Sequence, residues 1–279
     1  MPSSEKRLSP LGSLLHGFTA LLAPGECRLC DQPLLRVATY PVCDECLQAL
    51  HAMPLEQGCE RCSEPFSFES TREARAQRGV CPACLADEPA FARAVAFGSY
   101  DDLRPAVHLM KFEGVPTLAA PLGRMLAAAM LQLRSDAPED MAVVPVPLYR
   151  GKRGFNQSTL LAQSALKHVR RADPAWKLSL QPRLLRRTRW TESQFLLSPA
   201  QRRENVRGAF QASEVRGLHI LLIDDIYTTG ATVAECTRIL LRAGAASVRV
   251  ATLARAIKES AIRWRPPLSQ TARAGPMPQ

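Results

Sequence analysis

The stretch from Ile220 to Val233, ILLIDDIYTTGATV, decides the fold of this chain. Its first four residues, Ile220 to Ile223, form a run that is apolar on both sides, as is typical of a buried strand in a parallel sheet. Asp224 and Asp225 follow, and open α/β sheets bind ligands at this end of their strands. A turn of small, hydroxyl-bearing residues then opens a helix, and such a helix start is a ready anion site. The stretch therefore predicts an acidic pair that reads hydroxyl groups, next to a phosphate-binding turn.

The whole array resembles a known ligand-binding signature. The turn consists of Thr228, Thr229, Gly230, Ala231 and Thr232. Together with the strand and the acidic pair, it is similar to the phosphoribosyl pyrophosphate (PRPP) signature of type I phosphoribosyltransferases. The resemblance implies that Asp224 and Asp225 hold the ribose hydroxyls, that the turn wraps the 5′-phosphate, and that Mg²⁺ accompanies PRPP. The alternative is an ordinary βα turn in which the aspartates only cap the helix.

Eight of the nine cysteines fall into four C-x-x-C pairs. They are Cys27, Cys30, Cys43, Cys46, Cys59, Cys62, Cys81 and Cys84. Both thiolates of such a pair can reach one metal, and two pairs complete a tetrahedral site with no open position for water. Taken in order, the pairs predict two structural Zn²⁺ sites in a double zinc ribbon. A cross-braced pairing is an alternative, as are disulfides, which require an oxidising compartment. The ninth cysteine, Cys236, is predicted to lie in the core.

The length of 279 residues allows one full core and a smaller module. No apolar run is long enough to span a membrane. Residues 11–22 predict an amphipathic helix rather than a signal peptide, so we expect a cytoplasmic protein. The formal net charge is +10, and fourteen lysines and arginines lie between Arg150 and Arg207 against three acidic residues. This excess is compatible with nucleic acid, with a phosphate-rich small ligand, or with solvated surface arginines.

Beyond Cys84 the pattern alternates between strands and helices, which indicates a parallel α/β sheet with helices on both faces. Strands are expected at 94–100, 141–146, 177–180, 220–223 and 248–253, and helices at 102–112, 118–133, 157–169 and from the signature turn to 243. The expected organisation is an N-terminal amphipathic segment (1–24), the double zinc ribbon (25–88), a type I phosphoribosyltransferase-like domain (89–262) and a disordered tail (263–279).

Further strings point to one family. They are Lys111-Phe-Glu-Gly114, Val144-Pro-Val-Pro-Leu148, Arg153-Gly-Phe-Asn-Gln157, and the scattered residues Arg187, Thr188, Gln194, Arg203, Asn205, Gly208 and Phe210. With the cysteine pairs, they resemble the ComF-type competence family, whose members join a zinc ribbon to a phosphoribosyltransferase domain.

The basic loop after the second expected strand has a plausible task. Arg150, Lys152, Arg153 and Gly154 would form the pyrophosphate loop, because arginine binds phosphate bidentately and glycine lets the backbone approach the ligand. Asn156 is either a ligand contact or simply the cap of the next helix. The polar stretch 183–207 would act as a lid over the ligand, or is a solvated insertion. Possible lid or ligand contacts are Lys111, Arg187, Gln194 and Arg203.

The resemblance implies a PRPP-binding protein connected with DNA uptake in natural transformation, with single-stranded DNA or DNA-uptake proteins as partners. One alternative is an active transferase that moves ribose 5-phosphate from PRPP to a nitrogen acceptor and releases pyrophosphate. Another is a PRPP-responsive regulator without catalysis. No residue identifies itself as a catalytic base, and a fold with an intact PRPP site is not thereby an enzyme.

Overall fold

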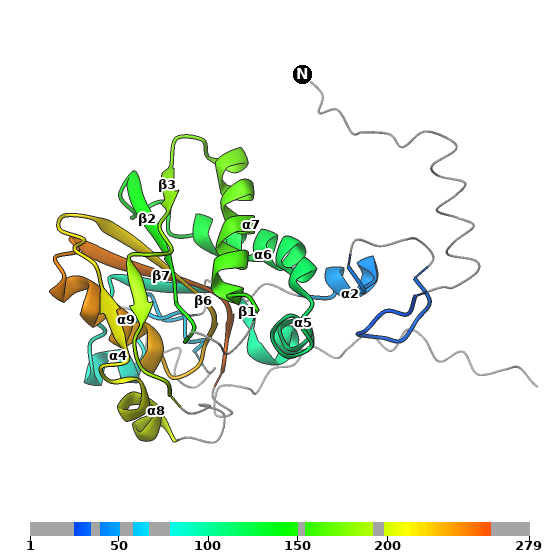
Figure 1. Cartoon of the computed structure of the whole chain (residues 1–279), viewed down its shortest axis with the longest axis horizontal. Helices are drawn as coiled ribbons and strands as arrows, with labels where there is room; N and C mark the ends of the chain where they lie inside the picture. The colour runs from blue at the N-terminus through cyan, green and yellow to red at the C-terminus, as the bar shows by residue number, and fades with distance from the viewer. Residues whose placement is uncertain are drawn as a thin grey trace, which may run out of the picture.

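A parallel sheet forms the centre of the molecule (Figure 1). The computed structural model describes residues 25–34, 40–50, 58–66, 79–149, 154–191 and 198–257. The five strands lie in the order β1-β7-β6-β2-β3, and every neighbouring pair is parallel. Their bounds are β1 (Arg93–Ser99), β2 (Asp140–Pro145), β3 (Lys177–Leu180), β6 (His219–Tyr227) and β7 (Ser247–Arg255). The predicted parallel α/β architecture is confirmed.

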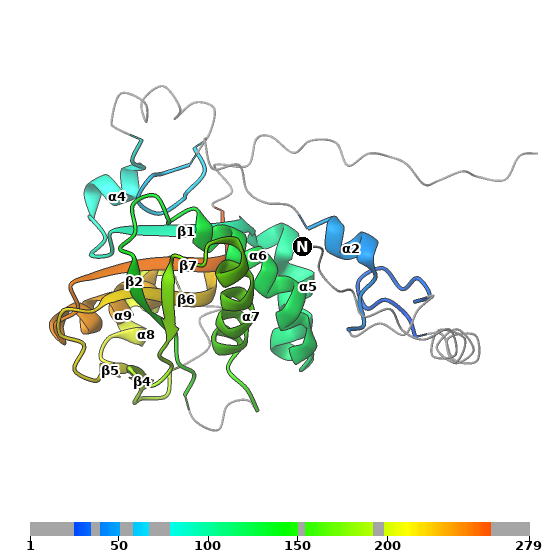
Figure 2. The same ribbon diagram turned by 90° about the horizontal axis from the view of Figure 1, so that it is seen from above.

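Helices cover both faces of the sheet (Figures 1 and 2). One face carries α5 (Tyr100–Phe112), α6 (Ala119–Leu131) and α7 (Gln157–Ala172), and the other carries α9 (Ala231–Arg242). A short 3₁₀ helix, η2 (Pro116–Leu118), leads into α6. Within β6, Leu221 and Ile223 pack toward α5, α6 and α7, whereas Ile220 and Leu222 pack toward α9. This alternation explains why the strand is apolar on both sides.

The strand β6 is longer than the expected span 220–223. Its pairing with β2 ends at Ile223, which lies opposite Pro145. Its pairing with β7 continues through Asp224 to Tyr227, which lies opposite Arg255. The acidic pair therefore lies within the last part of a strand that one neighbour still supports, instead of in the loop beyond it.

The polar stretch 183–207 contains ordered elements as well as undescribed residues. β4 (Leu185–Arg187) and β5 (Phe210–Ala212) form a small antiparallel sheet, and α8 (Pro199–Val206) lies between them in the chain. Ser198 begins α8 with a capping box. Leu185, Val206 and Phe210 are buried in the same cluster as the apolar face of α9. The proposed lid is therefore anchored on the sheet face that α9 covers.

The cysteine-bearing segments lie at two separate places (Figure 2). The first contains α2 (Asp44–Gln48) and lies beside α5, whereas the second contains α4 (Pro82–Ala86) and lies beside β1. None of the described helices has the length and hydrophobicity that a bilayer crossing requires. The expected amphipathic helix at 11–22 lies outside the described residues.

Candidate functional site

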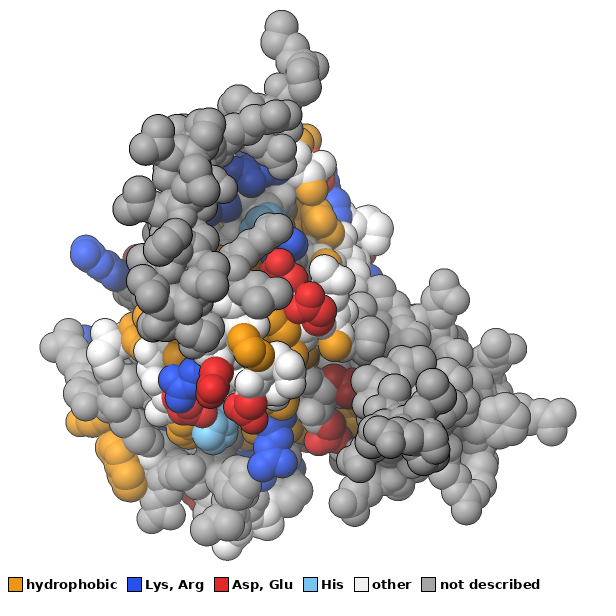
Figure 3. Space-filling view, turned by 90° about the vertical axis from the view of Figure 1, so that its right-hand side faces the viewer, with side chains coloured by type: hydrophobic (Ala, Val, Ile, Leu, Met, Phe, Trp, Pro, Cys, Tyr) orange, Lys and Arg blue, Asp and Glu red, His pale blue; other side chains and the backbone are white. Residues whose placement is uncertain are grey.

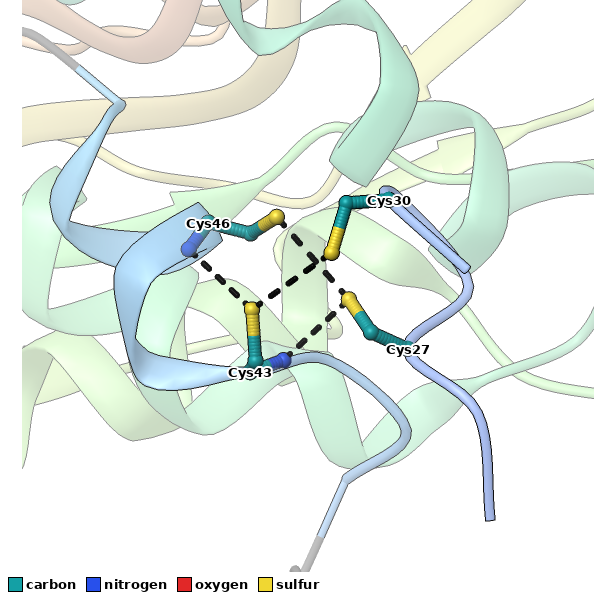
Figure 4. A group of neighbouring side chains, drawn as sticks. All are labelled: Cys27, Cys30, Cys43 and Cys46. Atoms are coloured by element: carbon teal, nitrogen blue, oxygen red, sulfur yellow. Dashed lines mark hydrogen bonds between the residues drawn. The ribbon is translucent and has the colours of Figure 1, made fainter. Parts of the chain in front are cut away.

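The cysteines form two groups with the geometry of metal sites. Cluster 1 is Cys27, Cys30, Cys43 and Cys46, and cluster 2 is Cys59, Cys62, Cys81 and Cys84. Within each cluster all four sulfur atoms lie within 4.8 Å of one another, and the side chains of cluster 1 converge on a common point (Figure 4). The predicted sequential pairing is confirmed, and the cross-braced alternative does not hold.

The sulfur separations fit zinc better than disulfides. The Sγ atoms of Cys27 and Cys46 lie 3.9 Å apart, those of Cys30 and Cys43 lie 3.8 Å apart, and the cysteines of both clusters are free. A disulfide would need about 2.05 Å. A tetrahedron with metal–sulfur bonds of about 2.3 Å has edges of about 3.8 Å. The four thiols of each cluster are thus already spaced to hold one Zn²⁺.

The two clusters differ in burial. Cys59, Cys62 and Cys81 are buried, whereas cluster 1 has only Cys27 buried. Hydrogen bonds from Cys62, Cys81 and Cys84 hold the pKa of Cys59 well below its usual range. The backbone N–H of Cys81 also donates to the Cys59 sulfur at 3.2 Å. Cluster 2 is therefore built to keep at least one ligand as a thiolate, which is the form that binds metal.

Two helices, α5 and α7, contact the acidic pair of β6. Lys111 of α5 places its Nζ 2.9 Å from Oδ2 of Asp225, so this lysine, which the sequence left without a partner, forms an ion pair at the centre of the site. Ser158 of α7 donates to Oδ1 of Asp224 at 3.1 Å, and the backbone N–H of Asp225 donates to the same oxygen at 2.9 Å. Sequence reasoning missed Ser158, although a hydroxyl in the first turn of a helix beyond β2 was a usable signal.

The charge of Asp224 is disfavoured where it stands. Burial raises its pKa to about 7, and the neighbouring charge of Asp225 adds to the effect, while Lys111 opposes it. Two adjacent carboxylates have one lysine near them, so their oxygens can accept further hydrogen bonds or bind a cation. Sugar hydroxyls and Mg²⁺ are ligands of this kind.

A glycine begins the helix that follows β6. Gly230 is the N-cap of α9 in the left-handed conformation with φ 79°, and the backbone N–H of Ala231 donates to Oγ1 of Thr229 at 3.4 Å. By contrast, Asn156 caps α7 and Ser198 caps α8 through their side chains. The first turn of α9 thus begins with a glycine N-cap and small residues, and such a helix N-terminus suits an anion.

The turn also packs closely against Tyr227. A Cβ at position 230 would lie 2.4 Å from Oη of Tyr227, so both this contact and the positive φ require glycine. Sequence reasoning did not single out Tyr227. Its signal was a large aromatic residue between the acidic pair and a turn of small residues.

The loop that is predicted to bind pyrophosphate is only partly described. Gly154 is exposed, and a side chain there would meet no atom within 4 Å. Asn156 accepts from the backbone N–H of Thr159 at 3.3 Å and donates to the carbonyl of Val146 at 3.0 Å, which confirms the capping interpretation and ties α7 to the end of β2. Outside the described residues lie Arg150, Lys152, Arg153 and Gln194.

The structure separates the two remaining basic candidates. Arg187, at the end of β4, donates to Oγ1 of Thr191, and its guanidinium lies 5.2 Å from the centre of the Phe210 ring. Burial lowers the pKa of Arg187, and the nearby carboxylate of Asp224 opposes that effect. Arg187 thus belongs to the surroundings of the acidic pair, whereas Arg203 is exposed on α8. Cys236 is fully buried on α9, as predicted.

Comparison with known proteins identifies the family. A model of the phosphoribosyl transferase domain matches residues 187–267. The DNA utilization protein YhgH of Salmonella typhi is 35% identical over 244 residues, which are 85% of this chain and 100% of that protein. Competence protein F of Haemophilus influenzae is 27% identical over 234 residues, which are 80% of this chain and 93% of that protein.

A solved hypoxanthine phosphoribosyltransferase of Staphylococcus aureus is 20% identical, with a TM-score of 0.33, over 51% of this chain and 65% of that one. So low a TM-score leaves the assignment to the family model, the sheet topology and the relatives. The chain belongs to the ComF/YhgH family of competence and DNA utilization proteins and contains a phosphoribosyltransferase domain.

Proposed function

We propose that this chain binds PRPP with Mg²⁺ at the carboxyl ends of β6 and its neighbours, as part of a role in DNA utilization. The observation that carries the proposal is the glycine-capped start of α9, which follows the acidic pair of β6 after a short turn, with Lys111 paired to Asp225. A phosphate site and a site for ribose hydroxyls would then be neighbours in the chain. The names of the relatives support the connection with DNA.

Each part of PRPP has a corresponding group in the chain. The residues 228–232 would hold the 5′-phosphate by backbone N–H groups and threonine hydroxyls. Asp224 and Asp225 would accept from the ribose hydroxyls, and Lys111 would then share Asp225 with the ligand. Arg150, Lys152, Arg153 and Gly154 would hold the pyrophosphate. Mg²⁺ bound with PRPP would offset the charge that pyrophosphate brings close to the acidic pair.

We also assign one Zn²⁺ to each cysteine cluster, in a structural role. Four cysteine ligands leave no coordination position for water or substrate, so the metal would supply folding free energy and no chemistry. Metal analysis of the purified chain should give two zinc ions per molecule, and a value near one or zero would reject the assignment.

The segment from β4 to α8 is the best candidate for contact with single-stranded DNA. Arg183, Arg186 and Arg189 are exposed there, and Trp190 is 52% exposed beside them. Arginines follow a phosphate backbone, and an exposed aromatic ring stacks on bases. On the side of the molecule viewed in Figure 3, by contrast, described basic and acidic side chains are intermixed.

Calorimetry and thermal unfolding test the PRPP assignment. Mg²⁺ and PRPP at about one hundred times the Kd should stabilise the wild type by about 2.7 kcal/mol. Asp224→Asn combined with Asp225→Asn should remove the effect, because the hydroxyl acceptors lose their charge. Asp140→Asn is the matched control, because Asp140 is exposed at the start of β2 and the acidic pair lies near the other end of the parallel strands. A wild type without any stabilisation would reject PRPP as ligand. Pyrophosphate release with nucleobases or amines, measured in parallel, would identify an active transferase.

Anisotropy of a labelled single-stranded oligonucleotide, measured at several salt concentrations, tests the DNA contact. Arg183→Glu with Arg186→Glu should weaken binding and lower its salt dependence, and Trp190→Ala should weaken it by about 1–3 kcal/mol through lost stacking. Arg124→Glu with Arg171→Glu makes the same charge change at exposed sites on α6 and α7, which cover the other face of the sheet. Equal weakening by the two double variants would mean that only net charge matters, which would remove this segment as the interface.

A further inference from the structure

We propose that cluster 2, when it holds its metal, positions the phosphate-binding turn through Arg255 and Tyr227, so that metal loading of this cluster and phosphate affinity are linked. The proposal rests on the PRPP site proposed above and concerns its regulation. Arg255 and Tyr227 are positioning residues, because they act on the turn without a ligand contact of their own.

The first contact joins the cluster to the end of β7. Arg255 is 5% exposed. Its Nη2 lies 3.6 Å from the sulfur of Cys62, and its Nε donates to Oε2 of Glu64 at 3.0 Å. A zinc ion with four thiolate ligands carries a net negative charge, which the guanidinium offsets in this outer shell. Loss of the metal would leave this buried cation with Glu64 as its anionic contact in the described chain.

The second contact joins Arg255 to the end of β6. The guanidinium lies 4.3 Å from the centre of the Tyr227 ring, a cation–π distance, and the two residues are partners in the register of β6 and β7. Tyr227 is also held edge-on by Phe91, with ring centres 6.4 Å apart. Phe91 belongs to the same buried cluster of side chains as Cys59, Cys62 and Cys81. The ring is therefore fixed from two directions by the surroundings of cluster 2.

The third contact reaches the turn itself. Tyr227 lies so close to Gly230 that a single added carbon at position 230 would overlap its hydroxyl. Gly230 is the N-cap of α9, and its left-handed conformation sets the direction of the N–H groups in the turn. A shift of the Tyr227 ring would remove the packing contact that holds Gly230 in place. The position of the phosphate-binding groups thus depends on the ring, and the ring depends on Arg255.

Cluster 1 provides an internal comparison. Its charged contact with the rest of the molecule is the ion pair between Arg28 and Glu113, at the end of α5. Cys27 and Val42 pack in the apolar cluster on the α5 side of the sheet, away from Tyr227 and α9. Metal in cluster 1 should therefore not influence phosphate affinity through the turn.

Calorimetry on the full zinc-loaded chain tests the link, with Mg²⁺·PRPP and inorganic phosphate as ligands. Arg255→Gln should weaken both ligands by at least about fivefold, the lower end of common coupling strengths. Arg255→Lys retains the charge and should recover part of the affinity, and Tyr227→Leu should resemble Arg255→Gln. Arg28→Gln, the equivalent change beside cluster 1, should leave the affinity unchanged.

Reciprocity gives a second readout that needs no variant. Linked sites must affect each other by the same factor. Mg²⁺·PRPP should therefore protect one of the two zinc ions against equilibrium competition by a chromogenic chelator in the wild type, and Arg255→Gln should lose this protection. If Arg255→Gln does not fold, the link is tested by the protection of zinc in the wild type and by the ligand affinity of Arg255→Lys.

The outcomes separate the two proposals. A wild type that binds PRPP, with equal affinity in Arg255→Gln or without protection of either zinc, would overturn the link and leave the PRPP site intact. A wild type that binds neither PRPP nor phosphate would overturn the PRPP site, and the link with it.

Discussion

At the scale of single residues, Asp224 lies at the proposed PRPP site and carries an unfavourable charge. Its Oδ1 accepts from Ser158 and from the N–H of Asp225, yet burial and the charge of Asp225 raise its pKa from 3.8 to about 7. Between those pH values the folded chain holds a proton that the unfolded chain has released. The free energy of unfolding therefore falls as pH rises through this window.

Asp224→Asn should remove the free-energy cost of a buried carboxylate at this position, because the amide keeps an oxygen acceptor and has no charge. We expect the free energy of unfolding to rise by roughly 1–3 kcal/mol at pH 8 and to change little at pH 4. Urea unfolding at the two pH values measures this, with Asp140→Asn as the exposed control. An equal change at both pH values would show that the effect has another origin.

At the scale of elements, α6 and α7 approach each other closely at Gly123. A Cβ at this position would lie 2.3 Å from the Cβ of Ser164 and 3.1 Å from the backbone nitrogen of Ala165. Alanine within an exposed helix would stabilise it by about 1 kcal/mol relative to glycine. Here the clash should outweigh that gain, because the two helices would have to move apart.

Gly123→Ala should lower the free energy of unfolding by about 1–3 kcal/mol. Adding Ser164→Gly removes the overlapping atoms and should restore part of the loss, which a double-mutant cycle measures. Arg124→Ala, on the exposed side of the same helix, should change little. A stabilised Gly123→Ala variant would contradict the close approach of α6 and α7.

The elements also show what the sequence could and could not predict. The buried run in β6, the helices with a clear apolar face and the C-x-x-C pairs follow from local periodicity and spacing, so they were predicted correctly. The strands β4 and β5 have three residues each, too few to show a period. The pairs Lys111–Asp225 and Arg255–Tyr227 join residues from different elements, and only the folded sheet brings them together.

At the scale of the whole molecule, the two cysteine clusters pack against different regions. Cluster 1 lies beside α5, whereas three cysteines of cluster 2 are buried with Phe91 and Tyr227 against the sheet. Because metal binding to such sites contributes directly to folding, the two metals should contribute unequally.

Chelation should therefore remove zinc in two steps. The more exposed cluster 1 should lose its metal first, with little change in the far-UV circular dichroism of the sheet. Loss of the second zinc should lower the Tm by about 10 °C or more, since each kcal/mol shifts the Tm of a chain of this size by about 2–4 °C. Metal analysis and thermal scans at each step measure this. Simultaneous loss of both metals with one transition would contradict the unequal roles.

The hydrogen bonds between cluster 2 and β1 have one more consequence. β1 is the terminal strand of the sheet. On its outer side, the N–H of Ala94 donates to the carbonyl of Arg61 at 2.8 Å, and the carbonyl of Ala94 accepts from the hydroxyl of Ser63 at 2.8 Å. An uncovered edge strand is a template for pairing with other chains. Arg61 and Ser63 in the loop of cluster 2 cover part of this edge. Light scattering should therefore rise once the metal of cluster 2 is lost, before the sheet itself unfolds.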